Sequence, residues 1–384
     1  MDSGSTWKSS LSSSERYENI QKIKKSIETL DSTNAAAQKD AFSVENKAYQ
    51  TSQSLDEYYA ACRIFATQEA PVSPAAEPQS TGDKVPLSPG IVIGPYHDCH
   101  YVASGVTAEV YRVNTRALKV ITETRNIEPH NPSREAKMLA SLKKPCIPLL
   151  ETFRDQEQRF VLVFPYMPLS LDALLARGPL SRAQVCKHFQ NLLGALEYIH
   201  SQGIIHRDIK PSAVLLESPD GPAYLSDFGT AWHPEMSVVT EPPDQKILDI
   251  GTGPYRAPEV LFGNRSYGPA VDMWGVGTML AECCRKPPRP LFESRPVDED
   301  GNQLGLILSI FKTIGTPTLQ SWPEAATFRT PPFEMYTVFE ERPWETILPD
   351  VDADFRDVVA SLVKYNSSRA TATQALSVEC LTTE

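Results

Sequence analysis

Two carboxylates and two lysines in this sequence have the types and spacing that phosphoryl transfer would require. Asp208 and Lys210 lie together in HRDIKP, and Asp227 lies downstream in SDFG. Lys119 lies upstream in RALKV, a stretch that reads as a strand. Phosphoryl transfer needs a lysine to hold the phosphates, a carboxylate to hold a metal ion and a second carboxylate to deprotonate the attacking hydroxyl. These four side chains could meet those needs.

The stretches that carry these residues resemble the catalytic motifs of eukaryotic protein kinases. HRDIKP resembles the catalytic loop, SDFG the metal-binding motif, and RALKV the strand with the ATP-contacting lysine. GTGPYRAPEV and VDMWGVG resemble the end of the activation segment and the central helix of the large lobe. The resemblance covers residues 95–384, and a lysine two residues after the HRD aspartate is typical of serine/threonine kinases. It therefore implies a serine/threonine kinase that uses ATP and Mg²⁺.

The resemblance implies a catalytic role for five residues. Asp208 would accept the proton of the substrate hydroxyl, and Lys210 would neutralise charge on the transferred phosphoryl group. Lys119 would contact the α and β phosphates, with its direction fixed by Glu135 of the helix-like stretch SREAKML. Thr252 would complete the set by hydrogen-bonding Asp208 and Lys210.

The resemblance also implies where the nucleotide binds. ASGVTAEVY aligns with the glycine-rich loop, Phe164 has the gatekeeper position, and Pro165 and Met167 lie in the hinge beside the adenine. Asp227 is the implied ligand of Mg²⁺, because a carboxylate offers a hard oxygen. The implied nucleotide-binding residues are Ala103, Gly105, Ala108, Val110, Ala117, Lys119, Phe164, Pro165, Met167, Leu216 and Asp227.

Two departures from the family bear on activity. The glycine-rich loop keeps only Gly105, since Ala103 and Ala108 replace the other glycines, and alanine disfavours backbone conformations that are open to glycine. Ala213 replaces the catalytic-loop asparagine, so this position can neither bind Mg²⁺ nor brace the backbone of Asp208.

Three hypotheses for the function are open at this point. In the first, the chain is an active kinase of reduced rate, with Ser212 or a water in part replacing the asparagine. In the second, it is a pseudokinase, a nucleotide-binding or interaction scaffold. In the third, residues 1–89 are the functional element and the kinase fold only presents it. Retention of the charged catalytic residues favours the first hypothesis.

The stretch IFKTIGTPTLQSWPE resembles the insert region of cyclin-dependent kinases. Where those kinases carry their cyclin-contacting helix, this chain has EPHNPSREAKML without the PSTAIRE pattern, which argues against cyclin dependence. The position of their activating threonine is Ile247 here, Thr240 is an alternative phosphosite, and Asp249 could offer a fixed negative charge to Arg207. These features resemble the fungal monomeric kinases that activate cyclin-dependent kinases, so a cyclin-dependent kinase is a candidate substrate.

The order of the expected elements indicates an α+β fold of two lobes. Strand-like stretches come first, and helical periodicity dominates after RFVLVFPYM. We expect a small β-rich lobe over residues 90–165 and a larger helical lobe over residues 168–384. The resemblance adds two structural contacts, an ion pair of Glu259 with Arg369 and a bracing of the HRD backbone by Asp272.

Residues 1–89 differ in composition from the rest and are expected to form a mostly disordered N-terminal extension. They open serine-rich and end in a linker-like run of Pro, Ser and Ala. Apolar residues at helical spacing over residues 17–30 favour one helix, and a second is possible within residues 43–66. The alternative is an arm that docks on the kinase domain or on a partner.

The charge and hydropathy of the chain exclude some functions. A net charge of −11 over 384 residues argues against nucleic acid or an anionic membrane surface as the main partner. No run approaches the length of a membrane span, and the first residues lack the apolar region of a secretory signal. The seven scattered cysteines form no CxxC pair and favour reduced thiols. We expect an intracellular protein, in the nucleus, the cytoplasm or both, and from the resemblance a monomer.

Overall fold

A computed structural model describes residues 90–382 except 106, 123–127, 144, 294–302, 329–332 and 334–335. Before them it describes residues 23, 41, 44–45, 47–49, 52 and 55–64. The described residues on either side of position 89 belong to two separate compact units.

The N-terminal unit contains a helix and a small apolar cluster. Helix α4 (Leu55–Ile64) lies within the stretch 43–66. Tyr58 is fully buried, and its hydroxyl donates a hydrogen bond to Glu45 Oε1 at 2.7 Å. Of the helix expected over residues 17–30, all but Ile23 lies outside the described residues. The buried members of the cluster are Ile23, Ala41, Ala48, Tyr58 and Cys62.

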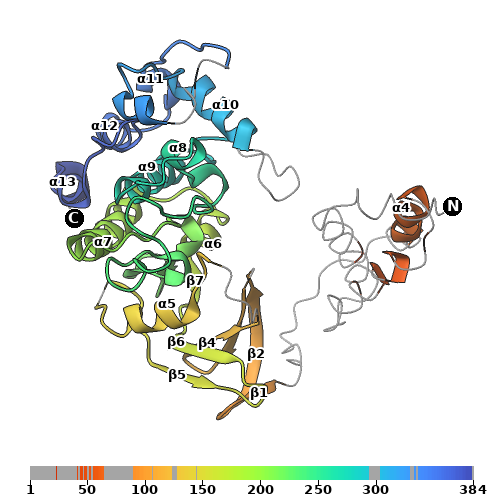
Figure 1. Cartoon of the computed structure of the whole chain (residues 1–384). Coiled ribbons are helices and arrows are strands. Elements are labelled where there is room, and N and C mark those ends of the chain that lie inside the picture. The colour runs from red at the N-terminus through yellow and green to blue at the C-terminus, as the bar shows by residue number, and fades with distance from the viewer. Residues whose placement is uncertain are drawn as a thin grey trace, which may run out of the picture. The chain divides into compact units, whose positions relative to one another are not determined.

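The small lobe of the second unit is a six-stranded sheet with the strand order β1-β2-β3-β4-β6-β5, in which neighbouring strands run antiparallel (Figure 1). In β4, Leu118 and Val120 are fully buried, whereas Ala117 and Lys119 lie on the opposite face because side chains alternate along a strand. The strands are β1 (Ile91–Ile93), β2 (Tyr96–Ser104), β3 (Ala108–Val113), β4 (Arg116–Ile121), β5 (Glu151–Arg154) and β6 (Phe160–Pro165).

Helix α5 (Pro132–Leu139) completes the small lobe, and its start is set by a cap. The side chain of Asn131 accepts a hydrogen bond from the backbone N–H of Arg134 at 2.9 Å, and a proline occupies the first turn. Met138 and Leu139 are buried in the main core. The cap and these two anchors together fix the position of Glu135 on the same helix.

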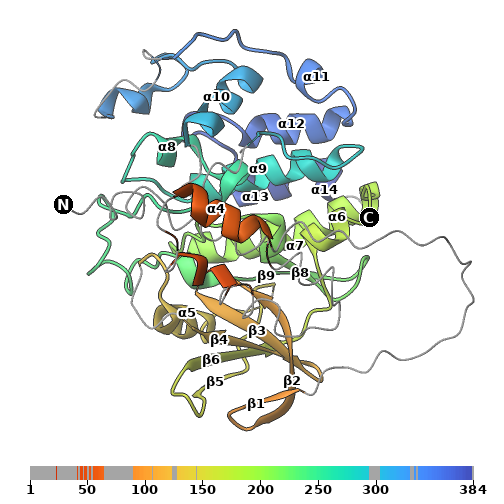
Figure 2. The ribbon, with the colours of Figure 1, turned by 90° about the vertical axis from the view of Figure 1, so that its right-hand side faces the viewer.

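The large lobe is mainly helical (Figure 2) and carries a three-stranded sheet of order β7-β8-β9. Its longest helix, α7 (Arg182–Ser201), begins with a capping box in which Ser181 and Gln184 each bond the other's backbone. The other elements are β7 (Leu169–Ser170), α6 (Leu171–Leu175), β8 (Val214–Leu216), β9 (Ala223–Leu225), α8 (Pro258–Leu261), α9 (Ala270–Cys284), α10 (Gln303–Ile314), α11 (Trp344–Ile347), α12 (Ala353–Leu362), α13 (Ala372–Leu376) and α14 (Glu379–Thr382), with short 3₁₀ turns η1 (Pro211–Ala213), η2 (Phe228–Thr230), η3 (Gly253–Tyr255) and η4 (Pro323–Thr327).

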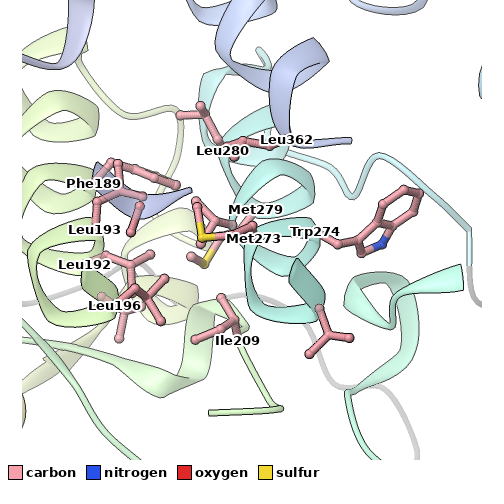
Figure 3. Packing of buried hydrophobic residues seen from close by; sticks show 14 of the residues in the cluster. Phe189, Leu192, Leu193, Leu196, Ile209, Met273, Trp274, Met279, Leu280 and Leu362 are labelled. Atoms are coloured by element: carbon pink, nitrogen blue, oxygen red, sulfur yellow. The ribbon is translucent and has the colours of Figure 1, made fainter. Parts of the chain in front are cut away.

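The core of the large lobe lies between α7 and α9 (Figure 3). Leu193 and Leu196 of α7 and Met279 of α9 are fully buried there, and each such side chain contributes about 1.5–3 kcal/mol. On another face of α9, a Cβ at Gly277 would lie 2.7 Å from Leu362 Cβ. Helices α9 and α12 therefore approach closely because that position has no side chain.

The expected α+β fold, with a β-rich small lobe and a helical large lobe, is confirmed. Helix α9 coincides with the stretch AVDMWGVGTMLAECC. Strands β5, β7, β8 and β9 were not predicted, because runs of two to four residues give little periodic signal. Within the described part of the chain, every helix is too short or too polar to cross a bilayer.

Candidate active site

Lys119 lies between two carboxylates from distant parts of the chain. Its Nζ lies 2.8 and 3.0 Å from the two carboxylate oxygens of Glu135 on α5, and 3.0 Å from Oδ1 of Asp227. The Glu135 side chain is 2% exposed and that of Asp227 is 49% exposed. A buried carboxylate therefore directs the lysine, and an exposed one is available to a ligand.

The charges in this group shift one another's pKa. Burial opposes the charged form of Lys119, but Asp227 and Glu135 outweigh it and raise the pKa of the lysine. The ammonium of Lys119 lowers the pKa of Asp227 well below its usual range, and the charges of Lys210 and His206 act in the same direction. Burial raises the pKa of Glu135, and the charge of Lys119 opposes that shift. Asp227 is therefore ionised at neutral pH, as a hard metal ligand must be.

The hydroxyl group of Thr252 is one of the points where the activation segment (Asp227 to Glu259) contacts the catalytic loop. Thr252 Oγ1 donates a hydrogen bond to Asp208 Oδ1 at 2.7 Å and accepts one from Lys210 Nζ at 3.0 Å. Lys210 Nζ also donates to Asp208 Oδ2 at 2.6 Å. The structure thus brings these three residues together. A carboxylate held in this way can accept a proton from a substrate hydroxyl, with a cation beside it for the transferred group.

Asp272 of α9 holds the backbone of the catalytic loop. Its carboxylate accepts hydrogen bonds from the backbone N–H groups of His206 at 2.8 Å and Arg207 at 2.7 Å, and His200 Nε2 lies at 2.9 Å. Burial opposes ionisation of Asp272, but the hydrogen bond with His200 and the other donors lower its pKa. Three partners satisfy this buried carboxylate, which is why it can stay charged inside the core.

Ala213 is buried, and its methyl side chain offers no ligand to a metal ion. Its carbonyl accepts hydrogen bonds from both the backbone N–H and the hydroxyl of Ser226, each at 2.9 Å. Ser212 lies on an exposed position of η1. No group of three or more His, Cys, Asp or Glu side chains placed to hold a metal occurs in the described parts of the chain. Asp227 thus fits Mg²⁺, whereas position 213 does not.

The residues predicted to contact nucleotide lie mainly on β3, β4 and β6. In the sheet register Val110 faces Lys119, and Ala117 faces Phe164. Pro165 is the last residue of β6, and Met167 packs against the main core just beyond it. Leu216 of β8 is fully buried.

The turn between β2 and β3 closes with a backbone hydrogen bond from Gly105 N–H to Ala108 O at 2.8 Å. Ala103 is exposed at the end of β2, and Ala108 is buried in a small cluster with Ile121 and Leu162. The methyl group at position 108 therefore packs inside the lobe. Its presence does not prevent β3 from pairing with both neighbours.

Arg207 pairs with Glu241, and the interpretation that Asp249 supplies its negative charge is wrong. Arg207 Nη1 and Nη2 lie 2.5 and 3.1 Å from the Glu241 carboxylate, and both side chains are fully buried. Asp249 is 86% exposed and lies 3.4 Å from Arg256 Nη2. Counting positions along the activation segment does not reveal which carboxylate folds back onto the arginine. The only signal in the sequence for this role of Glu241 is its position directly after Thr240, the alternative phosphosite.

The activation segment is held at its far end by a buried ion pair. Arg369 Nη1 and Nη2 donate to the two carboxylate oxygens of Glu259 at 2.5 and 2.8 Å, and Nη1 also donates to Ala270 O at 2.8 Å. The expected ion pair between the activation segment and the last helices is thus confirmed.

The two-lobed fold, the Lys119–Glu135 pair and the geometry of the HRD and DFG motifs are those of a protein kinase. The chain matches the family described as protein kinase domain over residues 96–381, and it belongs to that family. The chain is an ATP-dependent serine/threonine kinase, a class that typically uses Mg²⁺ and acts on protein substrates.

Three protein kinases of known sequence and one solved kinase structure are similar to this chain. Serine/threonine-protein kinase csk1 of Schizosaccharomyces pombe is 35% identical, over 70% of this chain and 89% of the relative. Serine/threonine-protein kinase CAK1 of Saccharomyces cerevisiae is 29% identical over 59% and 76% of the two chains. Cyclin-dependent kinase 7 of Carassius auratus is 31% identical over 73% and 81%. The yeast RNA Pol II CTD kinase CTDK-1 complex contains a chain with a TM-score of 0.62 and 26% identity, covering 82% of this chain and 97% of that one.

Proposed function

We propose that this kinase phosphorylates the activation segment of a cyclin-dependent kinase and needs no cyclin of its own. The resemblance to fungal monomeric kinases that activate cyclin-dependent kinases supports the substrate, as does the likeness to csk1, CAK1 and cyclin-dependent kinase 7. The observation that carries the proposal is the Lys119–Glu135 ion pair, which forms within one chain at 2.8 Å.

The surface of α5 supports independence from a cyclin. The exposed positions of the helix are Ser133 and Lys137, and Ala140 follows at its end. None of the exposed large hydrophobic side chains lies on this helix. The centre of a stable protein interface is rich in apolar and aromatic side chains. The outer face of α5 lacks such anchors, so we propose a monomeric enzyme.

In the proposed mechanism the phosphoryl group passes directly from ATP to the substrate. The substrate oxygen forms a bond to the γ-phosphorus, the bond from that phosphorus to ADP breaks, and Asp208 accepts the hydroxyl proton. Lys210 and Thr252 keep the Asp208 carboxylate directed through the hydrogen bonds at 2.6 and 2.7 Å. Lys119 holds the α and β phosphates. Mg²⁺, when bound, would be held by Asp227 and would neutralise phosphate charge.

Ala213 should lower the rate of this reaction without abolishing it. Lys119 is hydrogen-bonded to Asp227, and Asp208 is hydrogen-bonded to Thr252. What is lost is one oxygen ligand for the metal and one brace on the catalytic loop. The backbone of that loop is still held by Asp272.

The experiment is transfer of labelled phosphate from ATP to an intact, unphosphorylated cyclin-dependent kinase. The matched control substrate has its activation-segment threonine replaced by alanine. Wild-type enzyme should label only the first substrate, and Asp227→Ala should lose at least about 100-fold in rate because it removes the metal ligand. Ala213→Asn should be faster than wild type. Absence of transfer to any protein substrate, unchanged by Ala213→Asn, would instead identify a scaffold.

A further inference from the structure

Glu241 is a fully buried carboxylate in the middle of the activation segment. It accepts hydrogen bonds from Arg207 Nη1 at 2.5 Å, from Arg207 Nη2 at 3.1 Å and from the backbone N–H of Ile247 at 3.1 Å. Burial opposes its ionisation, but the hydrogen bonds and charge of Arg207 lower the pKa of Glu241. A buried charge of this kind is stable only where it is paired, so the segment must fold around it.

A second arginine reaches the same carboxylate from α5. Arg134 Nη1 lies 3.8 Å from Glu241 Oε1, and its side chain is 4% exposed. Arg134 Nη2 is held by the carbonyl of Pro129 at 2.6 Å and by Glu128 at 3.2 Å. The next residue on α5 is Glu135, the partner of Lys119. Glu241 thus links the helix that orients the lysine to the loop that carries Asp208.

The backbone around Glu241 is fixed as firmly as its side chain. The Trp232 indole N–H donates to Glu241 O at 2.9 Å, and Glu241 N–H donates to Ser237 O at 2.7 Å. Tyr267 accepts from Arg207 at 3.1 Å and donates to Ile247 O at 2.6 Å. The arginine, the tyrosine and the segment on both sides of Glu241 therefore form one connected network.

The site carries more positive than negative charge. Besides the two arginines it contains Lys246, whose pKa is lowered by burial and by the charge of Arg207. Lys246 Nζ lies 4.8 Å from the centre of the Trp232 ring. Glu241 and Glu128 are the acidic side chains in contact with these cations in the described structure. In kinases that are switched on by phosphorylation, a phosphate pairs with arginines in this way and orders the segment.

We propose that Glu241 is a positioning residue that takes the place of such a phosphate. This inference rests on the kinase activity described above. Glu241 contacts both Arg134 and Arg207 and thereby fixes the position of α5 relative to the catalytic loop. The active site is then assembled without phosphorylation of the activation segment. The nearby hydroxyl of Thr240 is on the surface, where it donates to Ser237 O at 3.2 Å, and has no part in this network.

The test compares wild type, Glu241→Gln and the matched control Asp249→Asn, all treated with phosphatase and shown by intact mass to carry no phosphate. Activity is measured on a cyclin-dependent kinase and on a generic serine/threonine peptide. Wild type and Asp249→Asn should agree within about twofold and keep their activity after phosphatase. Glu241→Gln should lose at least about tenfold in kcat, a loss of about 1.4 kcal/mol, with KM for ATP within about threefold.

Hydrogen exchange separates positioning from a general loss of folding. In Glu241→Gln, amides of α5 and of residues 203–209 should exchange faster while those of α9 do not change. If Glu241→Gln does not fold, Arg134→Gln serves instead, because it leaves the pair of Glu241 with Arg207 in place. It should speed exchange in α5 alone and lower kcat severalfold.

Two results would overturn the proposal: loss of wild-type activity after phosphatase, or equal activity of Glu241→Gln and Asp249→Asn. The use of two substrates allows failure of the role proposed for Glu241 to be distinguished from failure of the proposed function. Transfer to the peptide but not to the cyclin-dependent kinase, with the same dependence on Glu241, would reject the substrate and retain the role of Glu241.

Discussion

Thr252 Oγ1 lies 2.7 Å from Asp208 Oδ1, although the two residues are 44 positions apart. The same hydroxyl accepts a hydrogen bond from Lys210 Nζ at 3.0 Å. The activation segment is therefore attached to the catalytic loop at the two side chains that would handle the proton and the transferred phosphoryl group. A single hydroxyl both joins these elements and orients the carboxylate.

Removal of that hydroxyl should slow catalysis more than it destabilises the fold. Thr252→Ala leaves Asp208 and Lys210 with one partner fewer, at a cost of about 1–3 kcal/mol, so kcat should fall about 5- to 150-fold. Thr252→Ser keeps the hydroxyl and should retain most of the rate. Steady-state kinetics on one substrate would check this, and equal rates for the alanine and serine variants would contradict it.

The ion pair of Glu259 with Arg369 should be a large contributor to stability. Arg369→Met leaves Glu259 buried without its partner and should lower the free energy of unfolding by about 3–5 kcal/mol. The matched control is Arg182→Met, because Arg182 is 45% exposed in its pair with Asp354. Its loss should cost no more than about 1 kcal/mol. Urea unfolding measures both, and similar losses in the two variants would refute the difference.

Alanine should have opposite effects at two helical glycines. At Gly277 of α9 the new methyl would lie 2.7 Å from Leu362 Cβ and Val363 Cγ2, so Gly277→Ala should cost about 1–3 kcal/mol. At Gly194 of α7 the nearest atom lies at 3.9 Å. Gly194→Ala should therefore stabilise the protein by about 0.5–1 kcal/mol, because alanine favours a helix. Thermal unfolding of both variants would decide, and a loss of stability in Gly194→Ala would contradict the packing.

Because of His188, the free energy of unfolding should decrease as the pH falls. His188 is buried on α7 with Nε2 3.0 Å from Pro219 O, and burial lowers its pKa. Below about pH 6.5 the unfolded chain binds a proton at this histidine that the folded protein resists, so the free energy of unfolding decreases as pH falls. Between pH 7.5 and 5.5, Tm should drop more for wild type than for His188→Gln. Parallel decreases in the two proteins would show that His188 does not contribute.

The sequence by itself determined the class of fold and the identity of most site residues. HRDIKP, SDFG and RALKV identified Asp208, Asp227 and Lys119 because these stretches resemble protein kinase motifs, and phosphoryl transfer needs these residue types. The long helix α9 was predictable because a continuous apolar stretch of its length gives a clear signal. The loss of the metal-binding asparagine at Ala213 was also visible, since an alanine offers no ligand.

Only the tertiary structure decided which carboxylate pairs with Arg207. The activation segment contains several carboxylates, and local sequence gives no reason to choose Glu241 over Asp249 as the partner of Arg207. The two carboxylates differ in burial. Glu241 is fully buried between arginines from α5 and the catalytic loop, whereas Asp249 remains exposed to solvent. An ion pair gains strength where water is excluded, and that exclusion depends on how distant segments pack.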